Sequence, residues 1–302
     1  MTVRNPAIQH LVISGGGISL FKLIGSLDVL LRDEPPYFSM QQIKSIYGTS
    51  AGAIIGTVLA LGYEWDVVVD YFIKRPWKDV IQINVQSILD AYSRRGLFDQ
   101  RILEIIFKPL LDAKDIPLQI NLAAFFDVTG IDLHFFTLEL NRYVIEDVSH
   151  KTHPDLSLLT ALQMTACLPV LFSPVILGEK CYVDAGCIVN YPLQRCLDAG
   201  HDADAILGFK NQYDDIYEDV KNHTTQDSTL LEYLMNLFFK IVWEVSTECK
   251  QPKIKNEVLL LKMQPNTFSS IQKAIQLESE RALLFQAGQE SARLFLSSSS
   301  GL

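Results

Sequence analysis

One serine of this 302-residue chain stands where a nucleophile could be placed: Ser50, in the run Gly48-Thr49-Ser50-Ala51-Gly52. An apolar segment precedes the run and a helical pattern follows it. A strand-to-helix turn of the form Gly-x-Ser-x-Gly exposes the serine Oγ, because small residues let the strand and the helix pack closely. The helix N-terminus then offers N–H groups and the positive end of its dipole to a developing negative charge. We predict a nucleophile, with a simple helix cap as the alternative.

A triple glycine, Gly15-Gly16-Gly17, follows the first apolar segment and begins a helical pattern. Without Cβ atoms, such a loop can turn its N–H groups toward a ligand. A dinucleotide motif would need glycine at position 20, where this chain has Leu20. Adjacent parallel strands would bring this loop beside the Ser50 turn, so we expect an oxyanion hole, with the N–H of Ala51 as a further donor. A tight turn without a ligand is the alternative.

A serine nucleophile needs a base. No histidine stands at a clear exit from a predicted strand, although His150 and His153 come nearest to one. Asp184 follows an apolar run and precedes Ala185-Gly186, which places its carboxylate at the end of a buried strand. An ordinary Asp-x-Gly turn is the alternative. The six histidines are His10, His134, His150, His153, His201 and His223.

These residues must be positioned by alternating strands and helices. That alternation predicts an α/β protein with a mainly parallel sheet. We expect 211–227 to be a mobile loop and 297–302 a disordered tail. Strands are predicted at 10–14, 43–47, 131–139, 143–148, 181–183, 205–209 and 258–261, and helices at 18–32, 51–61, 156–167, 229–248 and 269–296, with an interrupted helical segment at 65–109.

The predicted helix 229–248 has a thin polar stripe. Nearly all its other residues are apolar, including Phe238, Phe239 and Trp243. Such a helix is buried or faces apolar material, so we expect either a core helix or a lid that faces a membrane. The stripe consists of Glu232, Asn236, Lys240, Glu244 and Glu248.

The charge, the cysteines and the absence of targeting patterns in the sequence argue against several classes of protein. The net charge of −9 argues against a partner held by bulk charge, such as nucleic acid. The cysteine count is odd and no CxxC pair occurs, which indicates free thiols in a reducing compartment. We find no signal-peptide pattern and expect no transmembrane helix, so a cytoplasmic protein is predicted. The cysteines are Cys167, Cys181, Cys187, Cys196 and Cys249.

Taken in order, these features resemble the patatin-like phospholipases, over roughly residues 10–210. That family combines a glycine-rich anion loop, Gly-x-Ser-x-Gly and a downstream aspartate followed by small residues. Several further stretches are similar to its motifs: Gly96-Leu97-Phe98-Asp99, Thr129-Gly130, the run ALQMTACLPVLFSPV at 161–175, and Asn190-Tyr191-Pro192.

The resemblance implies a three-layer α/β/α fold, with a catalytic domain at 8–210 and a helical extension at 211–296 packed on it. It also implies a Ser50–Asp184 dyad without histidine, Gly15, Gly16 and Gly17 as the oxyanion loop, and no cofactor or metal. The implied partner is a phospholipid or related glycerolipid, met at the surface of a membrane.

Two departures from the family pattern concern the site. Ser19 and Leu20 stand where the family has a basic residue and a glycine, and Lys22 is the nearest basic residue. Ala185 adds a Cβ beside Asp184. A silent lipid-binding protein of the same fold and a carboxylesterase of non-lipid substrates therefore remain as alternatives to a lipid acyl hydrolase.

Overall fold

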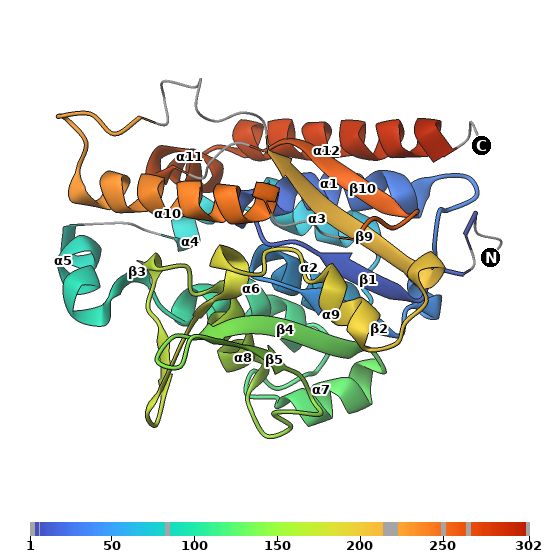
Figure 1. Cartoon of the computed structure of the whole chain (residues 1–302), viewed down its shortest axis with the longest axis horizontal. Helices are drawn as coiled ribbons and strands as arrows, with labels where there is room; N and C mark the ends of the chain where they lie inside the picture. The colour runs from blue at the N-terminus through green and yellow to red at the C-terminus, as the bar shows by residue number, and fades with distance from the viewer. Residues whose placement is uncertain are drawn as a thin grey trace.

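An eight-stranded sheet runs through the computed structural model (Figure 1), which describes residues 4–5, 7–81, 85–213, 223–248, 252–263 and 267–299. The strand order is β10-β9-β1-β2-β4-β8-β7, and β5 pairs with β4. The strands of this sheet are β1 (His10–Ile13), β2 (Ser45–Gly48), β4 (Asp132–Glu139), β5 (Val144–Val148), β7 (Val175–Leu177), β8 (Lys180–Asp184), β9 (Ile206–Tyr213) and β10 (Glu257–Met263).

The sheet is mixed and mostly parallel. β10, β9, β1, β2 and β4 pair in parallel, whereas β5, β7 and β8 are added antiparallel. A separate two-stranded sheet joins β3 (Gly96–Phe98) to β6 (Val170–Phe172). The helices are α1 (Leu20–Arg32), α2 (Ala51–Ala60), α3 (Trp65–Lys74), α4 (Trp77–Val80), α5 (Val85–Arg94), α6 (Arg101–Asp112), α7 (Leu122–Thr129), α8 (Leu158–Ala166), α9 (Leu193–Asp198), α10 (Leu230–Glu248), α11 (Phe268–Gln276) and α12 (Glu278–Ser299).

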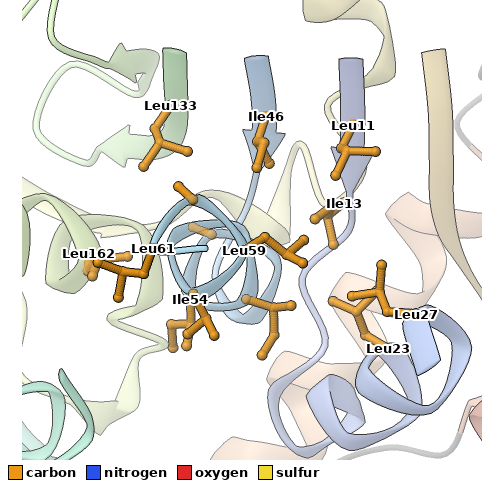
Figure 2. Close-up of a cluster of buried hydrophobic side chains, with 14 of the residues drawn as sticks. Leu11, Ile13, Leu23, Leu27, Ile46, Ile54, Leu59, Leu61, Leu133 and Leu162 are labelled. Atoms are coloured by element: carbon orange, nitrogen blue, oxygen red, sulfur yellow. The ribbon is translucent and has the colours of Figure 1, made fainter. Parts of the chain in front are cut away.

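Successive side chains of the central strands point to opposite faces of the sheet. On one face Leu11, Ile13 and Ile46 pack against α1 and α2 in the larger core (Figure 2). Val12 and Tyr47 point to the other face, where they share a smaller cluster with Leu193 and Cys196 of α9. Apolar side chains on both faces explain why the short strands read as continuous apolar runs. Helices cover both faces, which confirms the predicted α/β class.

The C-terminal segment completes the sheet and covers one of its helices. β10 pairs in parallel with β9, and α12 lies along α1 (Figure 1). Their backbones approach so closely that a Cβ on Gly25 would lie 1.9 Å from the carbonyl oxygen of Phe285, and one on Gly288 would lie 1.8 Å from that of Lys22. The helices can meet in this way because both positions are glycine.

Several elements differ from those predicted. The single closing helix is wrong, because Leu277 is extended and separates α11 from α12. The predicted tail is also wrong at 297–299, which belong to α12, while 300–302 lie outside the described residues. Asn211 begins the predicted loop but belongs to β9; positions 214–222 of that loop lie outside the described residues.

The described residues include no helix that combines the length and apolarity needed to cross a membrane. Cys249 lies outside the described residues, and the other four cysteines are free thiols.

Candidate active site

Strand β4 brings the ends of β2 and β8 together. Gly48, the last residue of β2, pairs with Phe135 of β4. Asp184, the last residue of β8, pairs with Thr137, two residues further along β4. The turn that carries Ser50 and the carboxylate of Asp184 therefore meet at one place on the sheet.

The Ser50 turn has the strained backbone of a strand-to-helix elbow. Its φ of 53° and ψ of −121° lie in a region that non-glycine residues seldom adopt. Ser50 occupies the N-cap position of α2, yet within this fully described helix its side chain makes no capping hydrogen bond. Gly52 allows the close packing that the turn needs, since a Cβ there would lie 2.5 Å from the carbonyl oxygen of Ile13.

The carboxylate of Asp184 is buried and lines the same cavity as the Ser50 side chain. The residue is 2% exposed, and its Oδ1 accepts the N–H of Gly186 at 2.7 Å. Burial raises the pKa of Asp184 to about 6, against the opposing effects of the Ser50 side chain and of the N–H of Gly186. The arrangement thus holds a carboxylate of increased proton affinity against a serine hydroxyl.

The triple-glycine loop lies beside this pair. A Cβ on Gly15 would lie 3.0 Å from Cβ of Ser50 and 2.8 Å from Oδ1 of Asn190. The N–H of Gly15 donates to the carbonyl of Asn190 at 3.0 Å, and its carbonyl accepts from the side-chain amide of Asn211. Gly15 is therefore tied on both sides, whereas Gly16 and Gly17 line the cavity described next.

A cavity of about 200 Å³ opens at the serine, the aspartate and the glycine loop. Among the described residues of its wall, the polar side chains are those of Ser50, Asp184 and Asn190, together with the indole of Trp243. The rest is apolar and comes from several elements that are distant in sequence: α6, β3, β6, α10 and α11. Representative wall residues are Ile106, Phe98, Phe172, Phe239, Val242 and Ile271.

None of the six histidines lines the described wall of this cavity. Four of them gather near the amino ends of β1, β2 and β4, whereas Ser50 follows the carboxyl end of β2. His134 stacks on Tyr47 with ring centroids 4.2 Å apart, and Tyr47 is within 3.1 Å of His201 Nε2. His10 stacks on His201 at 3.7 Å, and Nδ1 of His150 lies 3.1 Å from a carboxylate oxygen of Asp132.

His134 is the central charged group of this histidine cluster, which consists of His10, His134, His150 and His201. Its ring nitrogens lie 2.7 Å from Asp147 and 3.2 Å from Asp132. Burial alone would lower the pKa of His134, but the hydrogen bonds and charges of the two carboxylates raise it to about 9. This cluster ties β4 to β5 and to β2, outside the described wall of the cavity.

The departures from the family pattern have distinct places. Lys22 is buried, and its Nζ donates to the carbonyl of Leu261 at 3.2 Å; it is not among the described lining residues. Leu20 lines the cavity instead. The Cβ of Ala185 packs with Val12 and Tyr191 in the smaller cluster, while Gly186 faces the cavity. The added Cβ beside the aspartate therefore extends the core.

Thr165 and Asn211 were not predicted as site residues. Thr165 lies in the run at 161–175 and accepts the N–H of Ser50, so that run contained a usable signal. The sequence around Asn211 contained no such signal, because Asn211 begins a polar stretch that resembles a loop. Among the described residues, no group of three or more His, Cys, Asp or Glu side chains is arranged to hold a metal ion.

Comparisons with known proteins agree with this fold. The chain is 27% identical over 190 residues to the probable lipid hydrolase 463L of Invertebrate iridescent virus 6, and 26% identical over 191 residues to the uncharacterised protein R571 of Acanthamoeba polyphaga mimivirus. These matches cover 61% and 63% of this chain but only 62% of each viral protein, less than two thirds of its length.

Among solved structures, VipD from Legionella pneumophila matches 97% of this chain and 67% of its own with a TM-score of 0.53, which at 16% identity shows a shared fold. The family model described as patatin-like phospholipase matches residues 11–197, more than half of the chain and including Ser50, Asp184 and the glycine loop. The chain therefore belongs to the patatin-like phospholipase family.

Proposed function

We propose that the protein is a lipid acyl hydrolase that cleaves fatty-acyl esters through a Ser50–Asp184 dyad. The observation that carries this proposal is that Ser50 and the buried carboxylate of Asp184 meet at the wall of one largely apolar cavity. A carboxylate is a weak base in water, but burial raises the proton affinity of Asp184 toward neutral pH. Membership of the family and the name of the iridescent virus relative support the same chemistry.

In the first half-reaction Oγ of Ser50 attacks the acyl carbonyl as its proton passes to Asp184. The tetrahedral oxyanion is held by backbone N–H groups, for which we propose Gly16, Gly17 and Ala51. Ala51 is the first residue of α2, where N–H groups have no acceptor within the helix. The N–H of Gly15 supports the loop through Asn190 instead. Collapse of the intermediate expels the alcohol, which takes the proton from Asp184.

The second half-reaction reverses these roles. Asp184 takes a proton from water, whose oxygen attacks the acyl carbon of the Ser50 ester. Collapse of the second intermediate breaks the bond to Oγ, the proton returns to Ser50, and a free fatty acid leaves. Each proton that Asp184 accepts is given back within the same half-reaction, so the enzyme returns to its starting state.

For the substrate we propose a phospholipid or a related glycerolipid. The apolar wall suits a fatty-acyl chain, since burial of each methylene is favourable by about 0.8 kcal/mol. α10 supports access from a lipid surface, because it has apolar side chains on two faces. Phe239, Val242 and Trp243 line the cavity, while Leu237 and Ile241 are each 46% exposed.

The deciding experiment measures fatty-acid release from mixed phospholipid micelles by mass spectrometry, together with turnover of a chromogenic short-chain ester. Wild type should be active on both, and a fluorophosphonate should label Ser50. Ser50→Ala should lose both activities and the label while remaining folded.

Three outcomes would contradict the proposal. A folded wild type without turnover or labelling would indicate a silent lipid-binding protein. Turnover of the soluble ester without release from phospholipid would indicate a carboxylesterase. Persistent turnover by Ser50→Ala would remove the nucleophile assignment.

A further inference from the structure

The C-terminal end of α8 contacts the backbone of both residues of the proposed dyad. The hydroxyl oxygen of Thr165 accepts the N–H of Ser50 at 3.0 Å. The carbonyl of Cys167, two residues later, accepts the N–H of Asp184 at 3.1 Å. One short segment thus touches two residues that come from distant parts of the chain.

Thr165 is itself held in one orientation. It is fully buried, and its hydroxyl donates to the carbonyl of Phe136 in β4 at 2.6 Å. A hydroxyl has a single proton, so donation to Phe136 leaves its lone pairs for the N–H of Ser50. Phe136, whose carbonyl accepts this hydrogen bond, lies between Phe135 and Thr137 in β4. Those two residues pair with Gly48 and Asp184.

The rest of this segment is fastened to β4 and β8. The thiol of Cys167 donates to the carbonyl of Tyr182 at 3.1 Å. The hydroxyl of Thr137 lies 2.7 Å from the carbonyl of Met164 and 2.9 Å from that of Val183. The position of Thr165 is therefore set by two strands of the sheet and not by α8 alone.

Ser50 needs such a fixed partner. Its φ of 53° is unfavourable for a residue with a Cβ, and a backbone in that region persists only where its surroundings hold it. Thr165 supplies a buried acceptor for the Ser50 N–H at the point where β2 has ended and α2 has not begun. Without this acceptor the turn can rotate, and Oγ leaves its position beside Asp184.

We propose that Thr165 is a positioning residue of the acyl hydrolase, whose hydroxyl holds the Ser50 turn so that Oγ stays aimed at Asp184. This inference rests on the proposed dyad. Thr165 is not among the described residues of the cavity wall, although Ala166 and Leu168 are. Its loss should therefore reduce kcat and leave KM for the substrate largely unchanged.

The test compares two replacements of Thr165 on the chromogenic ester. Thr165→Val keeps the shape of the side chain but removes its hydrogen bonds, whereas Thr165→Ser keeps the hydroxyl. The valine variant should lose kcat by about 10- to 100-fold, because small misplacements of reacting groups cost rates of this order, with KM within about twofold. The serine variant should stay within about threefold of wild-type kcat, and fluorophosphonate labelling of Ser50 should slow in parallel with kcat.

Thr57→Val is the matched control. Thr57 is also fully buried, and its hydroxyl donates to the carbonyl of Ala53 at 2.9 Å within α2. Thr57→Val should lose about as much thermal stability as Thr165→Val, but its kcat should remain that of wild type. If Thr165→Val does not fold, Thr165→Cys replaces it, because a thiol of similar size is a much weaker hydrogen-bonding group. Its kcat should be clearly lower than that of the serine variant.

A folded valine or cysteine variant with wild-type kcat would overturn the positioning role while leaving the dyad intact. The same follows if Thr57→Val loses as much kcat as Thr165→Val, or if Thr165→Ser is as slow as Thr165→Val. A wild-type protein without turnover would instead refute the proposed function, and this inference with it.

Discussion

The Ser50 side chain and the carboxylate of Asp184 meet at the wall of one cavity, and no histidine is among the described residues of that wall. Burial raises the pKa of Asp184, and the Ser50 side chain and the N–H of Gly186 oppose this shift. In a Ser-His-Asp triad the aspartate would instead orient a histidine. The ionisation of Asp184 is therefore governed by its own burial, and this has consequences for stability as well as for catalysis.

Replacing Asp184 by Asn should abolish turnover and make the protein more stable at pH 8. Asp184 has a folded pKa of about 6 against an ordinary value of 3.8, so the charged carboxylate lowers the free energy of unfolding above pH 6. Removing that charge should raise the free energy of unfolding by roughly 1–3 kcal/mol at pH 8. The gain should shrink as the pH falls from 6 toward 4, where wild-type Asp184 becomes protonated. Denaturant unfolding at pH 4.5 and pH 8 measures both values, and a destabilised, inactive variant at pH 8 would contradict the expectation.

The pH dependence of kcat/KM should show an acid limb near pH 6. The proposed base must be ionised, so activity should fall about tenfold per pH unit below that value. A soluble chromogenic ester is the right substrate, because its ester group does not titrate in this range. A profile that is flat down to pH 4.5 would remove Asp184 from the role of base.

Replacing the six histidines by Gln one at a time should leave most of the activity in every folded variant. His134→Gln should nevertheless be less stable than wild type by about 1–3 kcal/mol, because Asp132 and Asp147 lose their shared partner. The pKa of His134 is raised to about 9, so its contribution to stability is complete below about pH 6.5 and is lost as the pH rises through 9. The melting temperatures of wild type and variant should therefore differ at pH 7 and converge at pH 10. A folded histidine variant that binds substrate normally and loses a thousandfold in kcat would revive a triad.

The exposed face of α10 should be needed for activity on vesicles but not on a soluble ester. This face consists of Leu230, Tyr233, Leu237 and Ile241, which are 46–72% exposed. Because the net charge is −9, attachment should depend on apolar contact more than on anionic lipid. Leu237→Glu combined with Ile241→Glu should reduce release from zwitterionic vesicles at least tenfold.

Leu283→Glu on α12 is the control for this surface, because Leu283 is 59% exposed but belongs to a different helix. It should leave both activities unchanged. If the α10 double variant and Leu283→Glu lose the same activity on vesicles, or if the double variant binds vesicles as well as wild type, α10 is only a wall of the cavity.

Local patterns were sufficient to predict the central elements of the site. Gly48 to Gly52 define the turn, and the apolar run before Asp184 defines its strand, because each depends on neighbours in sequence. The hydrogen bonds that join Ser50 and Asp184 to the end of α8 could not be predicted in this way. They depend on the register of β4, which pairs with β2 and β8 at once. Pairing between distant segments leaves little trace in either segment alone.

The polar stripe of α10 shows a second limit of sequence patterns. Glu232 accepts hydrogen bonds from the N–H and hydroxyl of Thr229 at the start of the helix, so it is used as a cap. Within the stripe Glu244 is exposed, but Glu232, Asn236 and Lys240 are half-buried, while the apolar Tyr233 and Leu237 are exposed. The stripe therefore marks the solvent side only in part, because packing partners outside the helix decide which face is covered.

The positions of β10 and α12 bear on when the proposed activity can arise during synthesis of the protein. Asn211, which holds the carbonyl of Gly15, belongs to β9, whose outer edge pairs with β10. The α1 surface next to the glycine loop is covered by α12, near the end of the described chain. A nascent polypeptide on the ribosome that has exposed Ser50 and Asp184 but not residues 257–299 therefore lacks the strand and helix that brace its anion loop. We expect such a chain to remain inert toward lipid until residues 257–299 have left the exit tunnel.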